Sequence, residues 1–509
     1  MKKAVSMATS PFQIFQPQRS TVRTTADAEP GVRVSGRFAV VEAEGLHWLY
    51  VPEVQRLYRL PADVADTLSS ASQDLTSPEY LSARQFIREL IAGHRSEPLQ
   101  NRDRNNTLRD LVVHPSQICN LDCKYCYAHE INQANQTMTQ DVADKVLSRA
   151  MKLAGPEGLA SVKFLGGEPT IAWDIVEHLV IAFKRAHEGL SSGNVPAFVV
   201  VTNGTLITPR IVEFAAKHRM YFLVSIDGEK NIHDLLRPNR NGAGSYGKAT
   251  ESLRQLLDAG ADVAIESVYT KQHIRNGITP LMMLNHFRSF GVRETHITVP
   301  LGTWHELQTV EEIQGATEGF VEAARASARS FRGDDPFLLR GITSVLDGFL
   351  LREDREYVCG AGRSFMAVNY DGEAFPCYLL ESSQTSYGFV DDRWDEGRYS
   401  EISHKFQRNG KLFHPVCRGC WNNELCQLCH GYSFAIEQKL SKPPDWLCSF
   451  IKSVTAAVLG EVAAARESAQ WDLFVANMKS SLLNPQKPFV PAVRDRTRNI
   501  VPLSASSPH

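Results

Sequence analysis

The sequence predicts an α/β protein: a partial (β/α)6 TIM-like barrel, with a small β-plus-α domain before it and a cysteine-rich domain after it. Three observations lead to this prediction. Apolar runs alternate with helical patterns from about residue 111 to residue 300, and short strand-like runs precede them. The 10 cysteines are confined to two regions. A chain of 509 residues is long enough for two or three domains.

The small N-terminal domain is expected at residues 31–94, after a polar segment of residues 1–30 that we expect to be flexible. Three short strands come first, with the turn Glu44–Gly45 between the first two. A helix can begin at Pro61, and a second one follows. The strand runs are Phe38–Val41, Trp48–Val51 and Leu57–Leu60, and the apolar stripe of the second helix is Phe86, Ile87, Leu90 and Ile91. This order predicts a winged-helix-like fold, joined to the barrel by a polar linker near residues 95–107.

The barrel is expected at residues 108–340, and its six apolar runs share a length typical of buried strands. They are Leu111–His114, Val162–Leu165, Ala197–Val201, Phe222–Ile226, Val263–Val268 and His296–Val299. Helical patterns lie between them, such as Asp141–Leu153, Pro209–His218 and Ser245–Leu257, and more helices follow from Thr309 to about Leu351. The cysteine-rich domain is expected at residues 341–480 with an alanine-rich helix near residues 453–468. A tail at 481–509 has the composition of a disordered segment.

Composition excludes several classes of function. A net charge of −2 offers no electrostatic footprint for nucleic acid or an anionic membrane. No stretch approaches the ~20 apolar residues of a membrane span. The basic pair Lys2–Lys3 is not followed by the uninterrupted apolar core of a signal peptide. We therefore expect a cytoplasmic protein, in which clustered cysteines ligate metal rather than form disulfides.

The first cysteine cluster is Cys119, Cys123 and Cys126, a C-x3-C-x2-C spacing just after the first barrel strand. Three thiolates on one loop can hold three corners of a [4Fe–4S] cube, which leaves one iron open. The alternative is a zinc site completed by His129 or His114.

Here the sequence resembles the radical S-adenosylmethionine superfamily. The resemblance implies that the open iron chelates S-adenosylmethionine, whose reductive cleavage gives a 5′-deoxyadenosyl radical that takes a hydrogen atom from the substrate. Tyr125 is placed like the family's adenine-side contact. The run Gly166-Gly167-Glu168-Pro169 matches the family's GGEP motif, in which Glu168 would accept a hydrogen bond from the methionine ammonium. The alternative for this run is a plain strand-to-helix turn with Pro169 at the first helical position.

The ends of two further strands carry polar residues that also resemble those of this superfamily. Thr202 and Asn203 end the third strand. Ser225 and Asp227 end the fourth, and these two side chains would reach ribose or carboxylate. Arg237 would be a carboxylate partner, or an exposed arginine with no specific role. The cysteine loop, the GGEP run and these two turns sit at the carboxyl ends of successive barrel strands, where such barrels place their active sites.

The second cysteine region resembles a SPASM domain, which holds two auxiliary [4Fe–4S] clusters. The resemblance assigns Cys359, Cys377 and Cys429 to the first and Cys417, Cys420, Cys426 and Cys448 to the second. Gly372 fits the G-x4-C step, whereas the 426–429 spacing is one residue short. Seven thiolates leave the first auxiliary cluster one ligand short, and paired zinc ribbons at 417–429 are the alternative.

The N-terminal domain resembles the precursor-recognition element of peptide-maturation enzymes, which adds a leader peptide to its sheet as an extra strand. The alternative is a simple cap on the barrel. We therefore expect a peptide-modifying enzyme that installs a thioether or carbon–carbon crosslink in a ribosomally synthesised precursor, with flavodoxin or ferredoxin as electron donor. One alternative is a sulfatase-maturating, formylglycine-forming enzyme, whose relatives carry an aspartate where this chain has Tyr378. Tyr378 would then be a base, a radical relay or a packing residue. The other alternative is a zinc-stabilised peptide-binding protein without catalytic activity.

Overall fold

A computed structural model describes residues 32–482, with gaps at 36–37, 53–54, 102–105, 130–133, 300–306, 427–428 and 441–444. Only scattered residues are described between 71 and 99, and the single positions 308, 352, 355, 356, 358, 438 and 439 also fall outside the description. The expected flexible N-terminus, the C-terminal tail and most of the linker lie outside the described residues.

Six neighbouring parallel strands form the wall of the barrel, in the sequence order that the alternating pattern predicted. They are β6 (Asp110–Ser116), β7 (Ser161–Gly166), β8 (Ala197–Thr202), β9 (Tyr221–Ser225), β10 (Asp262–Val268) and β11 (Glu294–Thr298). Each overlaps one of the expected apolar runs. The predicted partial barrel is therefore confirmed, and all six carboxyl ends point to the same rim.

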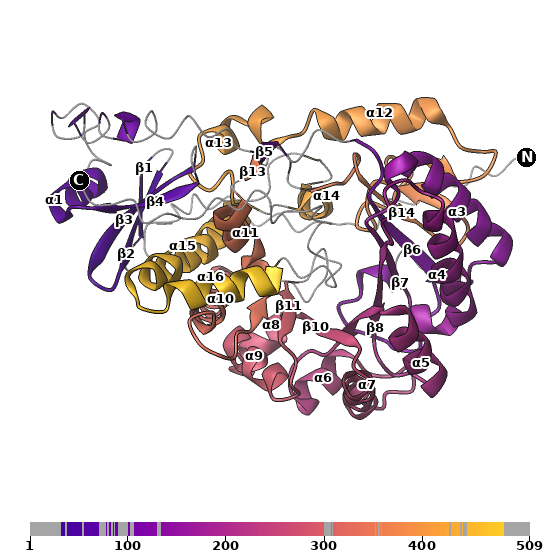
Figure 1. The fold of residues 1–509 in the computed structure, drawn as a ribbon. Helices are drawn as coiled ribbons and strands as arrows, with labels where there is room; N and C mark the ends of the chain where they lie inside the picture. The colour runs from indigo at the N-terminus through magenta and orange to yellow at the C-terminus, as the bar shows by residue number, and fades with distance from the viewer. Residues whose placement is uncertain are drawn as a thin grey trace, which may run out of the picture.

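Helices cover the outside of this wall (Figure 1). They are α3 (Gln140–Ala154), α4 (Trp173–Glu188), α5 (Pro209–His218), α6 (Lys230–Leu236), α7 (Tyr246–Asp258), α8 (Lys271–Arg275) and α9 (Pro280–Arg288). Four of them begin directly after a threonine whose side-chain oxygen accepts a hydrogen bond from a backbone N–H of the first turn, namely Thr139, Thr208, Thr270 and Thr279. These caps fix where each strand-to-helix loop ends.

The barrel sheet continues on both sides beyond the six expected strands. β12 (Leu338–Leu339) pairs with β11, and β14 (Phe365–Val368) pairs in parallel with β6. β15 (Glu373–Phe375) and β16 (Gly388–Phe389) extend the sheet from β14. The cysteine-rich region is thus built onto the strand that precedes the first cysteine cluster. A short pair, β5 (Gln100–Asn101) with β13 (Glu353–Asp354), ties the segment before the barrel to the segment before Cys359.

The remaining helices follow the barrel. They are α10 (Val310–Ser330), α11 (Thr343–Leu351), α12 (Glu396–Gln407), α13 (Pro415–Arg418), α14 (His430–Glu437), α15 (Asp445–Glu467) and α16 (Trp471–Leu482). α15 contains the alanine-rich stretch and packs against α10, where Glu461 forms ion pairs with Arg329 and Arg332. Contrary to the sequence-based expectation, α15 is long and apolar enough to cross a membrane. However, 61% of its most apolar window is buried inside the protein, as in a core helix.

The N-terminal domain is a four-stranded antiparallel sheet, one strand more than predicted, followed by α1 (Ala62–Ser70). Its strands are β1 (Val32–Ser35), β2 (Phe38–Ala43), β3 (Leu46–Val51) and β4 (Arg56–Leu60). The second expected helix is described only in part: residues 87–89 are helical and Ile87 is buried, whereas Phe86, Leu90 and Ile91 lie outside the described residues.

The two faces of the N-terminal sheet bury different sets of side chains. Phe38, Val40 and Leu49 pack under α1 in a small core of their own. Val41 and Trp48 belong instead to the large core shared with α15 and the barrel. Figure 1 accordingly places this sheet directly beside α15.

Candidate functional site

The loop after β6 carries Cys119, Cys123 and Cys126, which makes it the centre of the expected cluster site. Burial raises the pKa of Cys119 to about 11 and that of Cys123 to about 12, and Cys126 adds to both shifts. Thiols such as those of Cys119 and Cys123, which resist losing their protons, need a cationic partner before they can act as thiolates. The donor set therefore fits a bound iron cluster.

The alternative for this loop is a single zinc ion completed by His129 or His114. Among the described residues, no group of three or more His, Cys, Asp or Glu side chains stands close enough together to hold one metal ion. A [4Fe–4S] cube holds its cysteine ligands farther apart than a tetrahedral zinc ion does. His114, one of the two expected zinc ligands, pairs instead with Glu381, at 3.1 Å between Nδ1 and Oε1, and the side chain of the other, His129, lies outside the described residues.

The run Gly166–Pro169 packs directly against the cysteine loop. Gly166 has φ of +134°, and a Cβ on Gly167 would lie 2.4 Å from the carbonyl oxygen of Ile118, so neither position accepts a side chain. The N–H groups of Gly167 and Glu168 donate to the carbonyls of Ser116 and Ile118, each at 2.8 Å. Pro169 begins a short 3-10 helix (Pro169–Ala172), as expected of a strand-to-helix turn.

Glu168 joins the ends of two strands through its carboxylate. Its Oε1 accepts hydrogen bonds from the Thr170 and Thr202 hydroxyls at 2.6 and 2.7 Å, and its Oε2 accepts one from the N–H of Asn203 at 2.8 Å. The side chain is only 1% exposed, and burial raises its pKa. After burial itself, the nearby Glu168 carboxylate is the largest cause of the raised pKa of Cys119, and the Asn203 Nδ2 reaches the Cys119 sulfur at 3.8 Å. Glu168, Thr202 and Asn203 thus form one unit beside Cys119.

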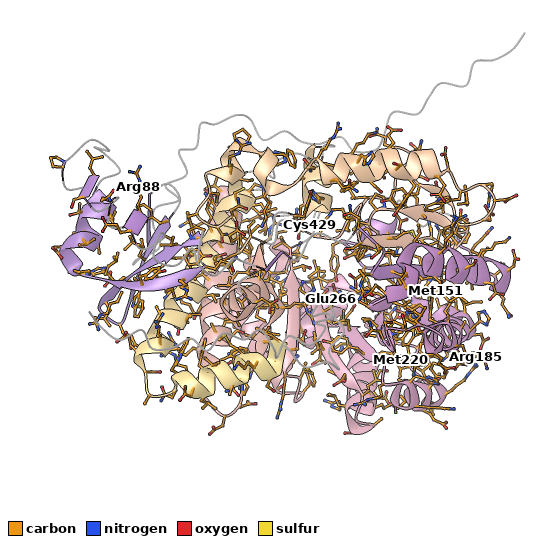
Figure 2. All side chains as sticks on the ribbon, turned by 45° about the horizontal axis from the view of Figure 1, so that its top comes forward. Arg88, Met151, Arg185, Met220, Glu266 and Cys429 are labelled. Carbon is orange, nitrogen blue, oxygen red and sulfur yellow. The ribbon has the colours of Figure 1, made fainter. Side chains whose placement is uncertain are left out.

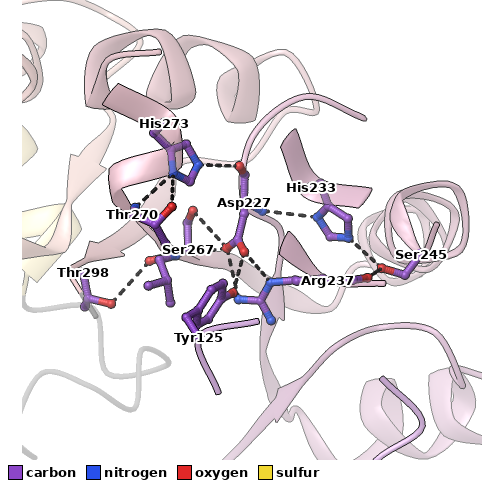
Figure 3. Close-up of polar contacts among 10 residues, drawn as sticks. Tyr125, Asp227, His233, Arg237, Ser245, Ser267, Thr270, His273 and Thr298 are labelled. Carbon is purple, nitrogen blue, oxygen red and sulfur yellow. Dashed lines mark hydrogen bonds and ion pairs between the residues drawn. The ribbon is translucent and has the colours of Figure 1, made fainter. Parts of the chain in front are cut away.

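Tyr125, Asp227 and Arg237 meet in a second unit (Figure 3), and Arg237 lies close enough to Cys123 to oppose the rise that burial causes in the pKa of that thiol. Arg237 donates two hydrogen bonds to Asp227, at 2.8 and 3.1 Å, and the Tyr125 hydroxyl donates a third. All three residues are buried. The structure therefore pairs Asp227 and Arg237 with each other. Their expected contacts to S-adenosylmethionine stay predictions, as does that of Ser225, which is buried beside Glu266 at the end of β9.

In the second cysteine region, the three thiols expected to hold the first auxiliary cluster come together. Burial, with the nearby thiols of Cys429 and Cys359, raises the pKa of Cys377 well above its usual range. Gly372, with φ of +89°, forms the turn between β14 and β15 that delivers Cys377. Of the other expected set, Cys417, Cys420 and Cys426 lie on one short segment, where the N–H of Cys420 donates to the carbonyl of Cys417. Cys448 lies in the first turn of α15.

Tyr378 lies between the barrel and the second cysteine region. Burial raises its pKa well above the usual range, and the Cys377 thiol adds to that effect. Its ring centroid is 6.0 Å from the Lys163 ammonium and 6.4 Å from the ring of Phe365. A phenol in this setting keeps its proton, so Tyr378 is better suited to donate a hydrogen bond than to act as a base.

Two charged residues on the inner face of the barrel were not expected from the sequence. Lys163 on β7 has a pKa lowered to about 8 by burial, although Glu266 opposes the shift. Burial opposes ionisation of Glu266 on β10, yet His296, 3.6 Å away, lowers its pKa to about 2. Figure 2 shows Glu266 and Cys429 near the centre of the molecule. The sequence signal that predicts such residues is a charged residue inside an otherwise apolar strand run. Because successive side chains of a strand point to opposite faces, a charged residue whose two neighbours point outward must point into the barrel.

Comparisons with known proteins agree with this geometry. The family model of the Radical SAM superfamily matches residues 113–274. A cysteine-type anaerobic sulfatase-maturating enzyme of Clostridium perfringens (strain ATCC 13124) is 32% identical over 347 residues, which cover 62% of this chain and 87% of that protein. The radical SAM cyclopropyl synthase TigE of Paramaledivibacter caminithermalis is 30% identical over 176 residues. That match covers 32% of this chain and only 35% of TigE, so the chain aligns with about a third of that relative.

Solved structures share the fold. The structure of native anSMEcpe with bound AdoMet superposes with a TM-score of 0.59 at 20% identity, covering 73% of this chain and 99% of that one. Native anSMEcpe with bound AdoMet and Cp18Cys peptide gives 0.58 at 20% identity, with 73% and 99% covered. The fold, the cysteine loop and the sequence matches lead to one conclusion: this chain belongs to the radical SAM superfamily, whose enzymes use a [4Fe–4S] cluster and S-adenosylmethionine.

Proposed function

We propose that this enzyme modifies a residue of a ribosomally synthesised peptide by forming a thioether or carbon–carbon crosslink. One observation carries the proposal: the second cysteine region is built onto the barrel strand that leads into the first. β14 pairs with β6 along its length, and Glu381, four residues after Cys377, contacts His114 on β6. Burial and the nearby Glu381, Cys126 and Cys377 raise the pKa of Tyr127. The sites expected for the first cluster and for the first auxiliary cluster would therefore lie near each other, which would suit a reaction that begins with hydrogen abstraction and ends with removal of an electron.

The cofactors would supply a 5′-deoxyadenosyl radical to this interior. The chain's own residues would bind and orient. Glu168 and Asn203 would hold the methionine end of S-adenosylmethionine beside Cys119, and Tyr125 would lie on its adenine side. Lys163 and Glu266 give the barrel interior fixed charges of both signs, which would orient polar groups of a bound peptide. Three clusters in all follow from the grouping of the ten thiols, and a flavodoxin or ferredoxin would deliver the electrons.

The sulfatase-maturating reaction is the second candidate, and a specific observation favours it. This chain covers 87% of a Clostridium perfringens enzyme of that class at 32% identity. The related structure with a bound Cp18Cys peptide supports a peptide substrate for either reaction. Against formylglycine formation, Tyr378 stands where those relatives carry an aspartate base, and burial, which raises the pKa of Tyr378, keeps its phenol protonated.

Co-expression with short open reading frames from the gene neighbourhood tests the proposal. A crosslinked product has lost two hydrogen atoms, whereas formylglycine made from cysteine has lost two hydrogen atoms and also carries oxygen in place of sulfur. Mass spectrometry of each peptide distinguishes the two. A variant in which alanine replaces Cys119, Cys123 and Cys126 serves as control. Failure of every neighbouring peptide, together with conversion of a sulfatase-derived cysteine peptide, would replace the first candidate with the second.

Glu168→Gln tests the proposed contact with S-adenosylmethionine. We expect the variant to keep its iron but to bind S-adenosylmethionine about ten- to hundredfold more weakly, because a charge-assisted hydrogen bond is worth about 1.5–3 kcal/mol. Equilibrium dialysis of the anaerobically reconstituted protein measures the dissociation constant. Glu177→Gln on the outside of α4, where Glu177 pairs with Arg210, is the matched control. An unchanged constant in Glu168→Gln would leave Glu168 as a turn residue only.

A further inference from the structure

The segment after β9 clamps the cysteine loop on both sides of Cys123. The N–H of Asp122 donates to the carbonyl of Pro238 at 2.8 Å, and the N–H of Lys124 donates to the carbonyl of Leu236 at 2.9 Å. Leu121 also forms a β-bridge with Asn239. Because the bonded residues flank Cys123 on one segment and Arg237 on the other, these two residues stand opposite each other.

Arg237 is held as half of a buried ion pair. Its guanidinium donates to both carboxylate oxygens of Asp227 and lies 5.3 Å from the centroid of the Tyr125 ring. Asp227 is fully buried, and it also accepts hydrogen bonds from the Tyr125 hydroxyl and, at 3.0 Å, from the N–H of Val268. The pair therefore joins the cysteine loop to the ends of β9 and β10.

Two neutral histidines hold the backbone of this pair in place (Figure 3). The N–H of Asp227 donates to Nδ1 of His233 at 3.2 Å, and Nε2 of His273 donates to the carbonyl of Asp227 at 2.9 Å. Ser245 donates to the carbonyl of Arg237 and contacts Nε2 of His233. Burial lowers the pKa of His233 to about 4, so it adds no charge near neutral pH. The permanent charges among the residues of this unit are those of Asp227 and Arg237.

We propose that Asp227 and Arg237 are positioning residues that set the reduction potential of the cluster held by Cys119, Cys123 and Cys126. One-electron reduction adds a negative charge to the cluster. A buried positive charge beside Cys123 favours the reduced state, and a buried negative charge disfavours it, because the interior screens little. Arg237 supplies the first charge, and Asp227 both fixes Arg237 in place and offsets it. The proposal rests on the cluster alone and is independent of the peptide reaction.

Opposite changes of charge should shift the potential in opposite directions. Asp227→Asn leaves Arg237 uncompensated and should raise the midpoint potential. Arg237→Gln leaves Asp227 uncompensated and should lower it, since Tyr125 and Val268 still donate to the carboxylate. We expect about a tenfold change in the reduction equilibrium each way, equivalent to about 59 mV for one electron. The double variant, uncharged at both positions, should return close to the wild-type value.

The experiment is a potentiometric titration of the reconstituted full-length protein, followed by electron paramagnetic resonance without substrate. The signal to follow is the one that disappears when Cys119, Cys123 and Cys126 are replaced together. Lys230→Gln, which removes an exposed charge from α6, is the matched control and should cause no shift. If Arg237→Gln loses its iron, the comparison of Asp227→Asn with the double variant still tests the proposal, because the first should raise the midpoint potential and the second should return close to the wild-type value. Shifts of the same sign, or an unchanged potential with iron retained, would overturn the proposal.

Discussion

Replacing Cys119, Cys123 and Cys126 together by alanine should remove about one third of the iron and abolish formation of 5′-deoxyadenosine. The ten thiols divide into groups of three, three and four, so the reconstituted protein should carry three [4Fe–4S] clusters, about twelve irons per chain. Only the first group lies beside Glu168, Asn203 and Tyr125. Iron and sulfide analysis, with chromatography of the products after chemical reduction, measures both effects.

The matched control is the variant in which alanine replaces Cys359, Cys377 and Cys429. It should lose a similar share of the iron but keep the background cleavage of S-adenosylmethionine. The fold should survive the first set of changes, because main-chain bonds such as that from Asp122 to Pro238 hold the loop without the thiols. Cleavage of S-adenosylmethionine by the first variant would show that the cluster assignment is wrong, and zinc without sulfide in the wild-type protein would show the same.

The barrel was predictable because each of its strands is an apolar run next to a helical pattern, and buried parallel strands have that signature. The added strands were not. β12, β15 and β16 are each two or three residues long, too short for any periodicity. β14 pairs with β6, far away in the sequence, so its place depends on tertiary packing. β1 was not recognised as a separate strand for a similar reason: its four residues VRVS are short and half polar.

The candidate site also has a part that the sequence could predict and a part that it could not. The spacing of Cys119, Cys123 and Cys126 places three thiols on one loop in any fold, so the sequence alone could predict their proximity. The bonding partners of Asp227 could not be predicted, since Tyr125, Arg237 and Val268 come from three different segments. The family resemblance assigns Asp227 and Arg237 to ligand contacts one at a time. Two opposite charges in one buried site pair with each other first, because an unpaired buried charge is strongly unfavourable.

The N-terminal domain is proposed to grip the leader of the precursor, but its deletion cannot isolate that role. Val41, Trp48 and Tyr50 are part of the core shared with α15, and Tyr50 packs edge-on against Trp421 with ring centroids 6.4 Å apart. Removing residues 32–93 would expose this surface and lower stability throughout the protein. Recognition has to be tested with the domain in place.

A proline scan of the leader, compared with an alanine scan, is the test that leaves the enzyme intact. Strand addition depends on main-chain hydrogen bonds, so proline within the docking segment should lower kcat/KM for modification at least about tenfold more than alanine at the same position. The substrate is the precursor identified by co-expression, and prolines outside the docking segment are the internal control. Equal effects of proline and alanine at every position would mean that the leader does not bind as a strand.

The structure also indicates which edge of the sheet to test. β1 and β4 are the two edge strands, and on β4 the carbonyl of Leu57 already accepts a hydrogen bond from Arg466 of α15 at 3.2 Å. A leader added to β4 must displace Arg466, so Arg466→Ala should strengthen precursor binding if that edge is used. Arg59→Ala, which removes a more exposed arginine of β4, is the matched control. If neither substitution changes affinity while the proline scan still shows a docking segment, the leader binds at the β1 edge.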